Sequence, residues 1–186
     1  MKPRTITPTD QERILPADRY ILSTSDLSGR ITSVNDLFIE FSGHPENDLL
    51  ATQHNIVRHP DMPRAVYSIM WDAIKDGDEF SGYIKNISKD GGFYWVYAHV
   101  LPITDAEGDL TGYRSVRRHA SRTAIAKVAA LYAEMLAAEK AAGPQHAIGA
   151  GLAVLRRHLA AAGMGWSQPS TPPRSSRAGA RSVENS

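Results

Sequence analysis

The order of strand-like and turn-like segments constrains the fold of this chain most. Two short segments with strand character, 20–25 and 31–35, flank the turn-forming residues 26–30, and this pattern predicts a hairpin. Three longer strand-like segments follow later in the chain, separated by two glycine-containing turns: 79–88, 93–103 and 110–118. The sequence therefore predicts five antiparallel strands.

Helix signals fall between the second and third strands. Asn35 or Asp36 can cap a short helix that runs to Phe41, and residues 45–50 form one further turn. An order of two strands, several helices and three strands is typical of an α+β fold. We expect the helices to cover one face of a five-stranded antiparallel sheet and to leave a cavity between helices and sheet.

The clearest helix signal starts at Asp61. We interpret Asp61 as the N-cap, with Pro63 in the first turn and Gly77 at the end. Apolar residues at helical spacing give this segment one apolar face: Val66, Ile69, Met70, Ala73 and Ile74.

Composition divides the chain into four parts. Residues 1–15 are expected to be a flexible leader, and residues 16–118 the folded domain. Residues 119–162 are rich in alanine, and Pro144 divides them into two expected helices, about 123–142 and 145–161. Residues 163–186 are rich in Ser, Pro and Arg and are expected to be a disordered tail.

Strand parity assigns Asn86 to the buried face of its strand. Asn86 alternates in step with Phe80 and Ile84, whereas the charged Lys85 marks the opposite face as solvated. A buried amide without hydrogen-bond partners costs about 1–3 kcal/mol. Its partner is either neighbouring backbone or a polar ligand, and strand parity leaves both open.

The segment 93–103 has a small face and a bulky face. Phe93, Trp95 and Tyr97 share the bulky face, which we expect the C-terminal helices or a partner subunit to cover. Arg117 and Arg118 end the last strand and are expected to lie in solvent. The opposite face leaves room for something flat, because it carries small side chains beside one tyrosine: Tyr94, Val96, Ala98 and Val100.

Composition also excludes several classes of protein. The 186 residues include 21 Lys and Arg and 20 Asp and Glu, and the formal charge of +1 does not fit a dedicated nucleic-acid binder. The chain has no cysteine, which excludes thiolate metal sites, iron–sulfur clusters and cysteine catalysis. No apolar run suits a signal peptide or a transmembrane segment, so we expect a cytoplasmic protein.

Metal binding and catalysis are not indicated. Pro60 and Pro63 interrupt the segment that contains His54, His59 and Asp61, so these side chains do not share one helical face. Candidate serine nucleophiles have no neighbouring base, and no phosphate-binding glycine loop precedes a helix. We therefore expect no metal site and no enzymatic activity.

One long block of sequence resembles a known family. The block is Gln53-His54-Asn55-Ile56-Val57-Arg58-His59-Pro60-Asp61-Met62-Pro63, followed by Met70-Trp71, by Ser81-Gly82-Tyr83-Ile84-Lys85-Asn86 and by Tyr94-Trp95-Val96. It closely resembles the PAS domain of bacterial Aer-type aerotaxis receptors, with a likeness that runs from Leu15 through Arg118. Those receptors continue to a membrane anchor and a methyl-accepting signalling domain, which we do not find in this sequence.

The resemblance implies a PAS fold that binds FAD non-covalently, with the flavin redox state as the signal. The FAD-linked positions of the family match Asn35, Arg58, His59, Asp61 and Asn86, and His54 and Trp71 match as well. The family commonly has tryptophan where this chain has Phe80. Phenylalanine keeps a flat apolar wall but lacks the indole N–H.

These residue types suit a flavin. An isoalloxazine ring needs an apolar slot with an amide at its polar edge, which Phe80, Ile84 and Asn86 could provide. The Arg58 guanidinium is a fork suited to the pyrophosphate, and Asp61 orders the loop that holds it. In the alternative interpretation Arg58 pairs with Asp61 and His59 only packs.

We therefore expect a PAS sensor that binds FAD and reports redox or oxygen status to a signalling partner such as a chemoreceptor or a kinase. Haem ligated by histidine is one alternative. The other is a cofactor-free interaction module, which would dimerise or hold a partner through the bulky sheet face and the C-terminal helices.

Overall fold

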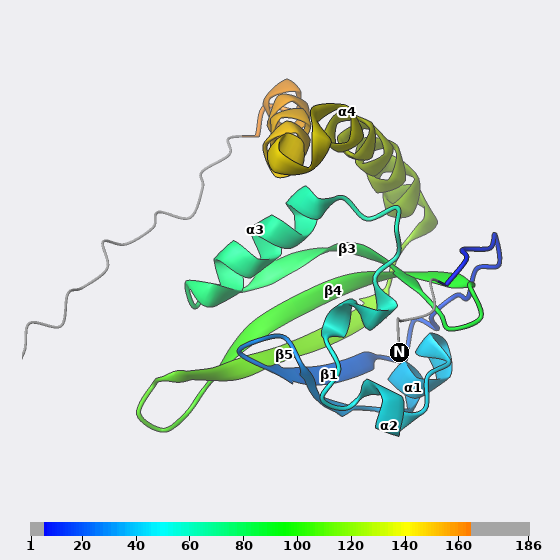
Figure 1. The fold of residues 1–186 in the computed structure, drawn as a ribbon, viewed down its shortest axis with the longest axis vertical. Coiled ribbons are helices and arrows are strands. Elements are labelled where there is room, and N and C mark those ends of the chain that lie inside the picture. The colour runs from blue at the N-terminus through cyan, green and yellow to red at the C-terminus, as the bar shows by residue number, and fades with distance from the viewer. Residues whose placement is uncertain (1–5, 165–186) are drawn as a thin grey trace, which may run out of the picture.

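The computed structural model describes residues 6–164, and within this range five strands form one antiparallel sheet. The strands lie in the order β2-β1-β5-β4-β3, so the first hairpin and the long strands share one sheet (Figure 1). Their bounds follow the sequence signals closely: β1 Ile21–Asp26, β2 Ile31–Val34, β3 Phe80–Ile87, β4 Phe93–Thr104 and β5 Leu110–His119.

The helices between β2 and β3 cover one face of the sheet (Figure 1). They are α1 Asp36–Ser42, α2 Glu46–Leu49, the short 3₁₀ helix η1 His54–Val57 and α3 Arg64–Lys75. The expected α+β class is therefore confirmed, with the helices on one side.

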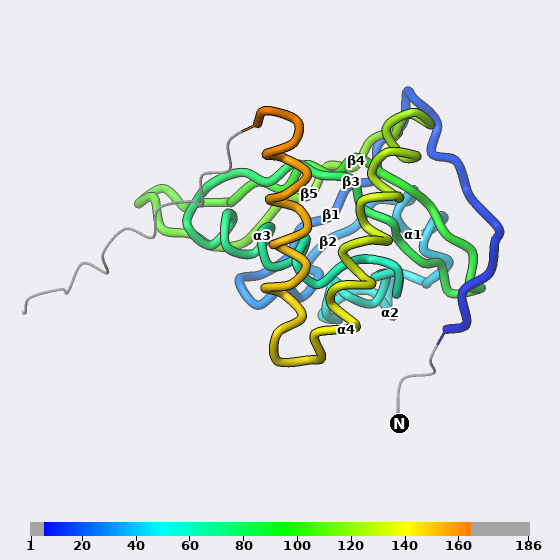
Figure 2. The backbone as a smooth tube through the Cα atoms, turned by 90° about the horizontal axis from the view of Figure 1, so that it is seen from above, coloured from blue at the N-terminus to red at the C-terminus, as the bar shows by residue number. Residues whose placement is uncertain are grey.

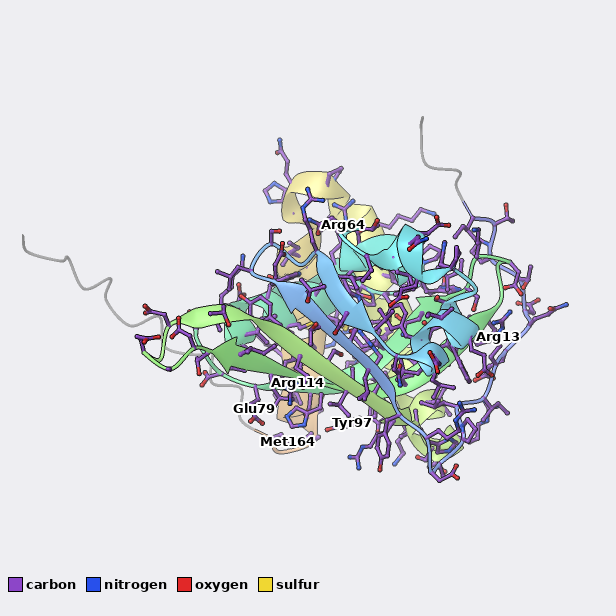
Figure 3. The ribbon with its side chains drawn as sticks, turned by 90° about the horizontal axis from the view of Figure 1, so that it is seen from below. Arg13, Arg64, Glu79, Tyr97, Arg114 and Met164 are labelled. Carbon is purple, nitrogen blue, oxygen red and sulfur yellow. The ribbon has the colours of Figure 1, made fainter. Side chains whose placement is uncertain are left out.

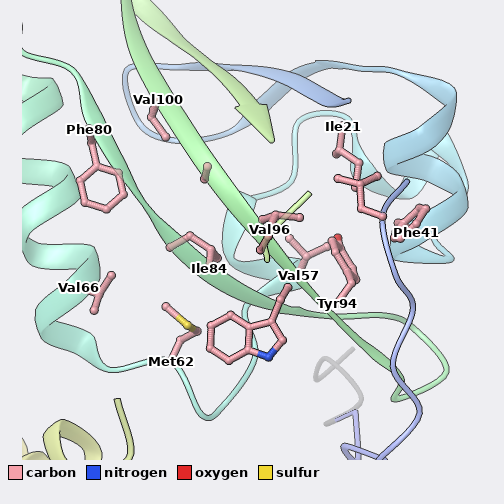
Figure 4. Close-up of a cluster of buried hydrophobic side chains, with 14 of the residues drawn as sticks. Ile21, Phe41, Val57, Met62, Val66, Phe80, Ile84, Tyr94, Val96 and Val100 are labelled. Atoms are coloured by element: carbon pink, nitrogen blue, oxygen red, sulfur yellow. The ribbon is translucent and has the colours of Figure 1, made fainter. Parts of the chain in front are cut away.

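The core lies between these helices and the inner face of the sheet. Figure 4 shows Met62 and Val66 on the helix side and Ile84 and Val96 on the strands. Alternation of apolar residues along β3 and β4 places Ile84 and Val96 in the core, as strand parity predicts.

The start of α3 differs from the prediction. The helix begins at Arg64, three residues after Asp61, and the Asp61 carboxylate forms an ion pair with Lys85 at 2.7 Å. The expected N-cap role of Asp61 is therefore wrong. The first N–H groups of α3 are instead bound by Glu139, a residue far along the chain.

Residues 6–15 are ordered along the β3–β4 turn, contrary to the expected flexible leader. Backbone hydrogen bonds join Thr9 to Gly91 and Arg13 to Phe93, each at 2.8 Å. Leu15 is fully buried. Apolar burial and backbone pairing fix this segment, and both depend on contacts with distant parts of the chain.

The C-terminal segment forms a helical hairpin, α4 Arg122–Ala161. Gly143, with φ 74°, ends the first arm and precedes Pro144, as the proline signal predicts. The two arms lie side by side and cover α3 (Figure 2). The expected disordered tail, residues 163–186, lies almost wholly outside the described residues.

The first arm of α4 covers one end of the bulky sheet face. Trp95 packs against Tyr132, with ring centroids 6.2 Å apart, and the Tyr132 hydroxyl donates to the Tyr83 carbonyl at 2.8 Å. Tyr97 stays half-buried beside Arg118, on the sheet side away from Arg64 (Figure 3). The C-terminal helix therefore covers part of this face.

Within residues 6–164 the helices lack the combination of length and apolar character that a membrane span requires.

Candidate functional site

A cavity of about 210 Å³ lies between the inner face of the sheet and α3. Segments from β1, η1, α3 and the three long strands all contribute to its wall. The lining residues are Ser23, Ser25, Gly29, Gln53, His54, Asn55, Arg58, Tyr67, Met70, Trp71, Ile74, Ile84, Asn86, Ala98, Val100, Tyr113, Ser115 and Arg117.

The walls are largely apolar. Ile84, Ala98 and Val100 form the sheet side, and their small or branched side chains leave the expected space. On the helix side Trp71 meets Tyr113 edge to face, with centroids 5.6 Å apart. Such walls suit a planar ligand.

Asn86 points into this cavity, as strand parity predicts. Its side chain is 4% exposed, and Nδ2 has no hydrogen-bond partner among residues 6–164. The Ser115 hydroxyl also lines the cavity and is likewise unbonded within the described chain. We call Asn86 Nδ2 and Ser115 Oγ the polar pair. Buried polar atoms of this kind point to a polar ligand.

Arg117 is buried on the cavity wall, 5% exposed, so the expectation that it lies in solvent is wrong. The guanidinium donates to Ser23 Oγ at 3.2 and 3.3 Å and to His54 Nε2 at 2.7 Å. Burial lowers the pKa of Arg117 to about 10, so the side chain stays cationic at neutral pH. Arg117 shares its strand face with Tyr113 and Ser115, and this parity could have revealed it.

His54 is neutral. Burial and the adjacent Arg117 lower the pKa of His54 to about 3. A guanidinium only donates hydrogen bonds, so Nε2 of His54 accepts and the ring proton lies on Nδ1. The cavity wall therefore has a buried cation whose partners are neutral.

Arg58 also lines the cavity and is half-buried. Its Nη2 donates to the Met62 carbonyl at 3.1 Å, and the guanidinium lies 4.2 Å above the centroid of Tyr67. Asp61 bonds Lys85 rather than Arg58, so the alternative pairing of Arg58 with Asp61 is wrong. No carboxylate lines the cavity among the residues that the structure describes.

His59 and Asp61 do not line the cavity and lie in the loop that follows Arg58. His59 is 2% exposed, accepts the Asp61 N–H at Nδ1 over 3.1 Å and packs against Phe93. Burial, with Lys85 nearby, lowers the pKa of His59 to about 4. These contacts order the loop between Arg58 and Met62, which fits an indirect role.

Asn35 and Phe80 do not line the cavity either. Asn35 Oδ1 accepts from the N–H groups of Leu22 and Phe38, and its Nδ2 donates to the Tyr20 carbonyl. It caps α1. Phe80 lies on the α3 side of β3 (Figure 4), with its ring folded over Gly82. Of the nine expected site residues the cavity brings together five: His54, Arg58, Trp71, Ile84 and Asn86.

Eight polar or aromatic residues that line the cavity were not among the expected site residues: Ser23, Ser25, Gln53, Asn55, Tyr67, Tyr113, Ser115 and Arg117. Tyr67 lies on the cavity side of α3, and burial raises its pKa to about 12, so its hydroxyl stays protonated. Among residues 6–164 no three acidic or histidine side chains gather into a candidate metal site.

The fold agrees with the result of a comparison with known protein families. Residues 31–117 match the family model described as the PAS fold. The resemblance stated from the sequence is thereby confirmed for the domain.

The sequence is also similar to individual proteins of known function. Over 124 residues the chain is 43% identical to the aerotaxis receptor of Escherichia coli (strain K12), a match that covers 67% of this chain and 24% of the receptor. Over 100 residues it is 27% identical to the nitrogen fixation regulatory protein of Klebsiella pneumoniae, covering 54% of this chain and 20% of that protein. The chain therefore spans a quarter or less of the length of these relatives.

Solved structures show the same fold. A light-oxygen-voltage domain studied with a flavin analogue has a TM-score of 0.54 at 18% identity, covering 59% of this chain and 84% of that chain. The light-state structure of the Aureochrome1 LOV photoreceptor has a TM-score of 0.53 at 19% identity, covering 61% and 88%.

Proposed function

We propose that this PAS domain binds FAD non-covalently in the cavity and signals the redox state of the flavin to a partner protein. The observation that carries the proposal is the polar pair, buried in a largely apolar cavity beside the cationic Arg117. The similarity to an aerotaxis receptor supports the same function.

A flavin suits both the walls and the polar atoms. The isoalloxazine ring is flat and apolar on its faces, with carbonyl and N–H groups at its pyrimidine edge. Ile84 and Trp71 would lie against the faces, and Asn86 and Ser115 would bond the edge. The polar pair has no partner among the described residues, so both groups are available to bond such an edge.

The charge of the cavity supports an electron-rich ligand. Two guanidinium groups, Arg58 and Arg117, line a wall to which the described residues contribute no carboxylate. Arg117 lies deep, where it would face the carbonyl edge of the ring. Arg58 is more exposed and is bonded to a single backbone carbonyl, which leaves other N–H groups of its fork to hold a pyrophosphate.

The size of the cavity sets how a dinucleotide would lie. A volume of about 210 Å³ is smaller than the roughly 300–1,000 Å³ of typical ligand pockets. The cavity would therefore enclose the ring system, and the adenosine part would lie outside it. The position of Arg58 at the half-exposed side agrees with this arrangement.

A bound flavin supplies reversible electron uptake coupled to protonation at the polar edge of the ring. Asn86 can respond because its amide both donates and accepts, and Arg117 can stabilise negative charge at that edge. A changed hydrogen bond at Asn86 would alter β3 and then α4, which contacts β3 through Tyr132. The partner would be a chemoreceptor, a kinase or a second copy that contacts the sheet face and α4.

Haem fits the cavity less well. Iron needs a histidine nitrogen that is free to ligate it. On the described cavity wall the histidine is His54, whose Nε2 lies 2.7 Å from the Arg117 guanidinium. Iron at this nitrogen would lie next to a fixed cation, which favours flavin over haem.

The absorption spectrum of the freshly purified chain tests the proposal. We expect yellow protein with flavin bands and, after denaturation, release of FAD identified by mass spectrometry. Apoprotein should take up added FAD, with quenching of flavin fluorescence. Colourless protein that takes up no flavin would contradict the proposal, and a Soret band in place of flavin bands would replace it with the haem alternative.

A further inference from the structure

Glu139 makes an unusual contact between the C-terminal hairpin and α3. Its side chain is buried, 6% exposed, although it lies on α4 in an otherwise alanine-rich stretch. The two carboxylate oxygens accept the backbone N–H groups of Arg64 and Ala65, each over 2.9 Å. A carboxylate from one helix therefore caps the N-terminus of another.

Glu139 takes the place of a capping side chain from the residue that precedes α3. The residue before Arg64 is Pro63, whose side chain makes no capping hydrogen bond, so Glu139 satisfies two N–H groups that a helix start leaves open. The negative charge also lies at the positive end of the α3 dipole. The beginning of α3 therefore depends on the docking of α4.

The second arm of α4 closes the same contact. A Cβ atom at Gly151 would lie 2.6 Å from Glu139 Oε1 and 2.9 Å from the Ala65 Cβ. Only glycine lets the second arm approach this closely. Both arms and the start of α3 meet at one point, and the hairpin covers α3 there (Figure 2).

The other side of α3 forms a wall of the cavity. Tyr67, Met70, Trp71 and Ile74 all line it, and the first of them follows Ala65 by two residues. The helix that Glu139 caps is therefore the helix that a ligand in the cavity contacts. A shift of α3 changes the geometry of both sites.

We propose that Glu139 couples occupation of the cavity to docking of the α4 hairpin, through α3. A ligand that fixes α3 strengthens the Glu139 cap and holds the hairpin down, and a docked hairpin strengthens ligand binding by the same factor. This inference rests on the proposed flavin site. It assigns the coupling to α3 and to one carboxylate, rather than to the sheet alone.

Release of the hairpin would uncover an apolar surface. Tyr132, Met135 and Val154 of α4 are buried and belong to the same hydrophobic cluster as the core of the domain. Glu139 thus acts as a positioning residue that decides whether this surface is available.

Glu139→Gln tests the coupling, with Glu134→Gln as the control. Glutamine keeps the shape but replaces one carboxylate oxygen by an NH₂ group that cannot accept. Glu134 lies on the same arm, is half-exposed and pairs only with the second arm among the described contacts. We expect the Kd for FAD to rise about tenfold in Glu139→Gln, equivalent to about 1.4 kcal/mol, and to stay unchanged in Glu134→Gln.

Amide hydrogen exchange gives a readout that a merely structural role would not move. In the wild type, added FAD should slow exchange at the Arg64 and Ala65 amides and across the hairpin. In Glu139→Gln these amides should exchange fast with or without FAD. Gly151→Ala should act the same way from the other arm, whereas Gly149→Ala, with open space around its Cβ, should not.

The outcomes separate the two proposals. A wild-type protein that binds no flavin overturns the proposed function and the coupling together. Flavin binding of equal affinity in the wild type, Glu139→Gln and Gly151→Ala overturns only the coupling, as does FAD-independent exchange at Arg64 and Ala65 in the wild type.

Discussion

Arg117 Nη2 lies 2.7 Å from His54 Nε2, and both groups line the wall of one cavity. The histidine is neutral, and the hydrogen-bond partners of the guanidinium in the described chain, His54 and Ser23, carry no charge. Burial of a charge is costly unless it is compensated. A ligand with an electron-rich edge would supply such compensation from within the cavity.

Replacement of Arg117 should stabilise the flavin-free protein and weaken the binding of FAD. We expect Arg117→Met to raise the free energy of unfolding of flavin-free protein by about 1–3 kcal/mol, because an apolar side chain of similar length removes a buried charge. The same variant should bind FAD at least about tenfold more weakly. Urea unfolding and fluorescence titration measure the two effects. Arg114→Met, at an exposed site on the same strand, is the control. A destabilised apoprotein or unchanged affinity would count against the role of Arg117.

Asn86→Ala should lose affinity at small cost in stability. Nδ2 makes no hydrogen bond within residues 6–164, so its removal should change the free energy of unfolding by less than about 1 kcal/mol. The Kd for FAD should rise about 5- to 150-fold, because a bound ring would lose its amide partner. Ser81→Ala, on the opposite face of β3, should leave both unchanged. Equal affinity in the wild type and Asn86→Ala would remove Asn86 from the site.

Gly29 controls the position of Trp71. A Cβ atom at Gly29 would lie 2.8 Å from Cη2 of Trp71, and the residue has φ +79°. Gly108 has φ +86° with nothing within 4 Å of a Cβ. Both alanine variants should lose about 1–2 kcal/mol of stability from backbone strain. Only Gly29→Ala should displace Trp71 and weaken FAD binding. Fluorescence titration of both variants checks this, and equal affinities would show that Trp71 does not shape the site.

Stability should fall as the pH drops below about 6.5. Burial lowers the pKa of His54 to about 3 and of His59 to about 4, so between pH 6.5 and about 4 the unfolded chain binds protons that the folded chain does not. The free energy of unfolding should then fall with decreasing pH by up to about 1.4 kcal/mol per unit for each histidine. Urea unfolding of apoprotein from pH 6.5 to 5 measures this slope. His54→Gln should make it shallower, and an identical slope would show that His54 titrates normally in the fold.

The local parts of the structure could be predicted from the sequence. Alternation along β3 placed Asn86 in the cavity, and Pro144 divided the C-terminal helices, because both signals depend on near neighbours. The start of α3 could not be predicted in the same way. Its cap, Glu139, is 75 residues from Arg64, and no local pattern indicates that contact.

Arg117 was missed for a different reason. A charged residue at the end of a strand is usually solvated. Its burial depends on Ser23 and His54, which reach it only when β1 and η1 pack against β5. Alternation along β5 nevertheless places Arg117 on the same face as Tyr113 and Ser115. A cation on the inner face of a strand is therefore a candidate site residue, as an amide there is.

The side-chain amide resonances of Asn86 test the central claim most directly. In ¹⁵N-labelled protein, added FAD should shift both Nδ2 proton signals and slow their exchange, since Nδ2 would gain a hydrogen-bond acceptor. Reduction of the bound flavin with dithionite should shift them again. Signals that stay unchanged on addition of FAD that demonstrably binds would contradict the claim that Asn86 contacts the ring.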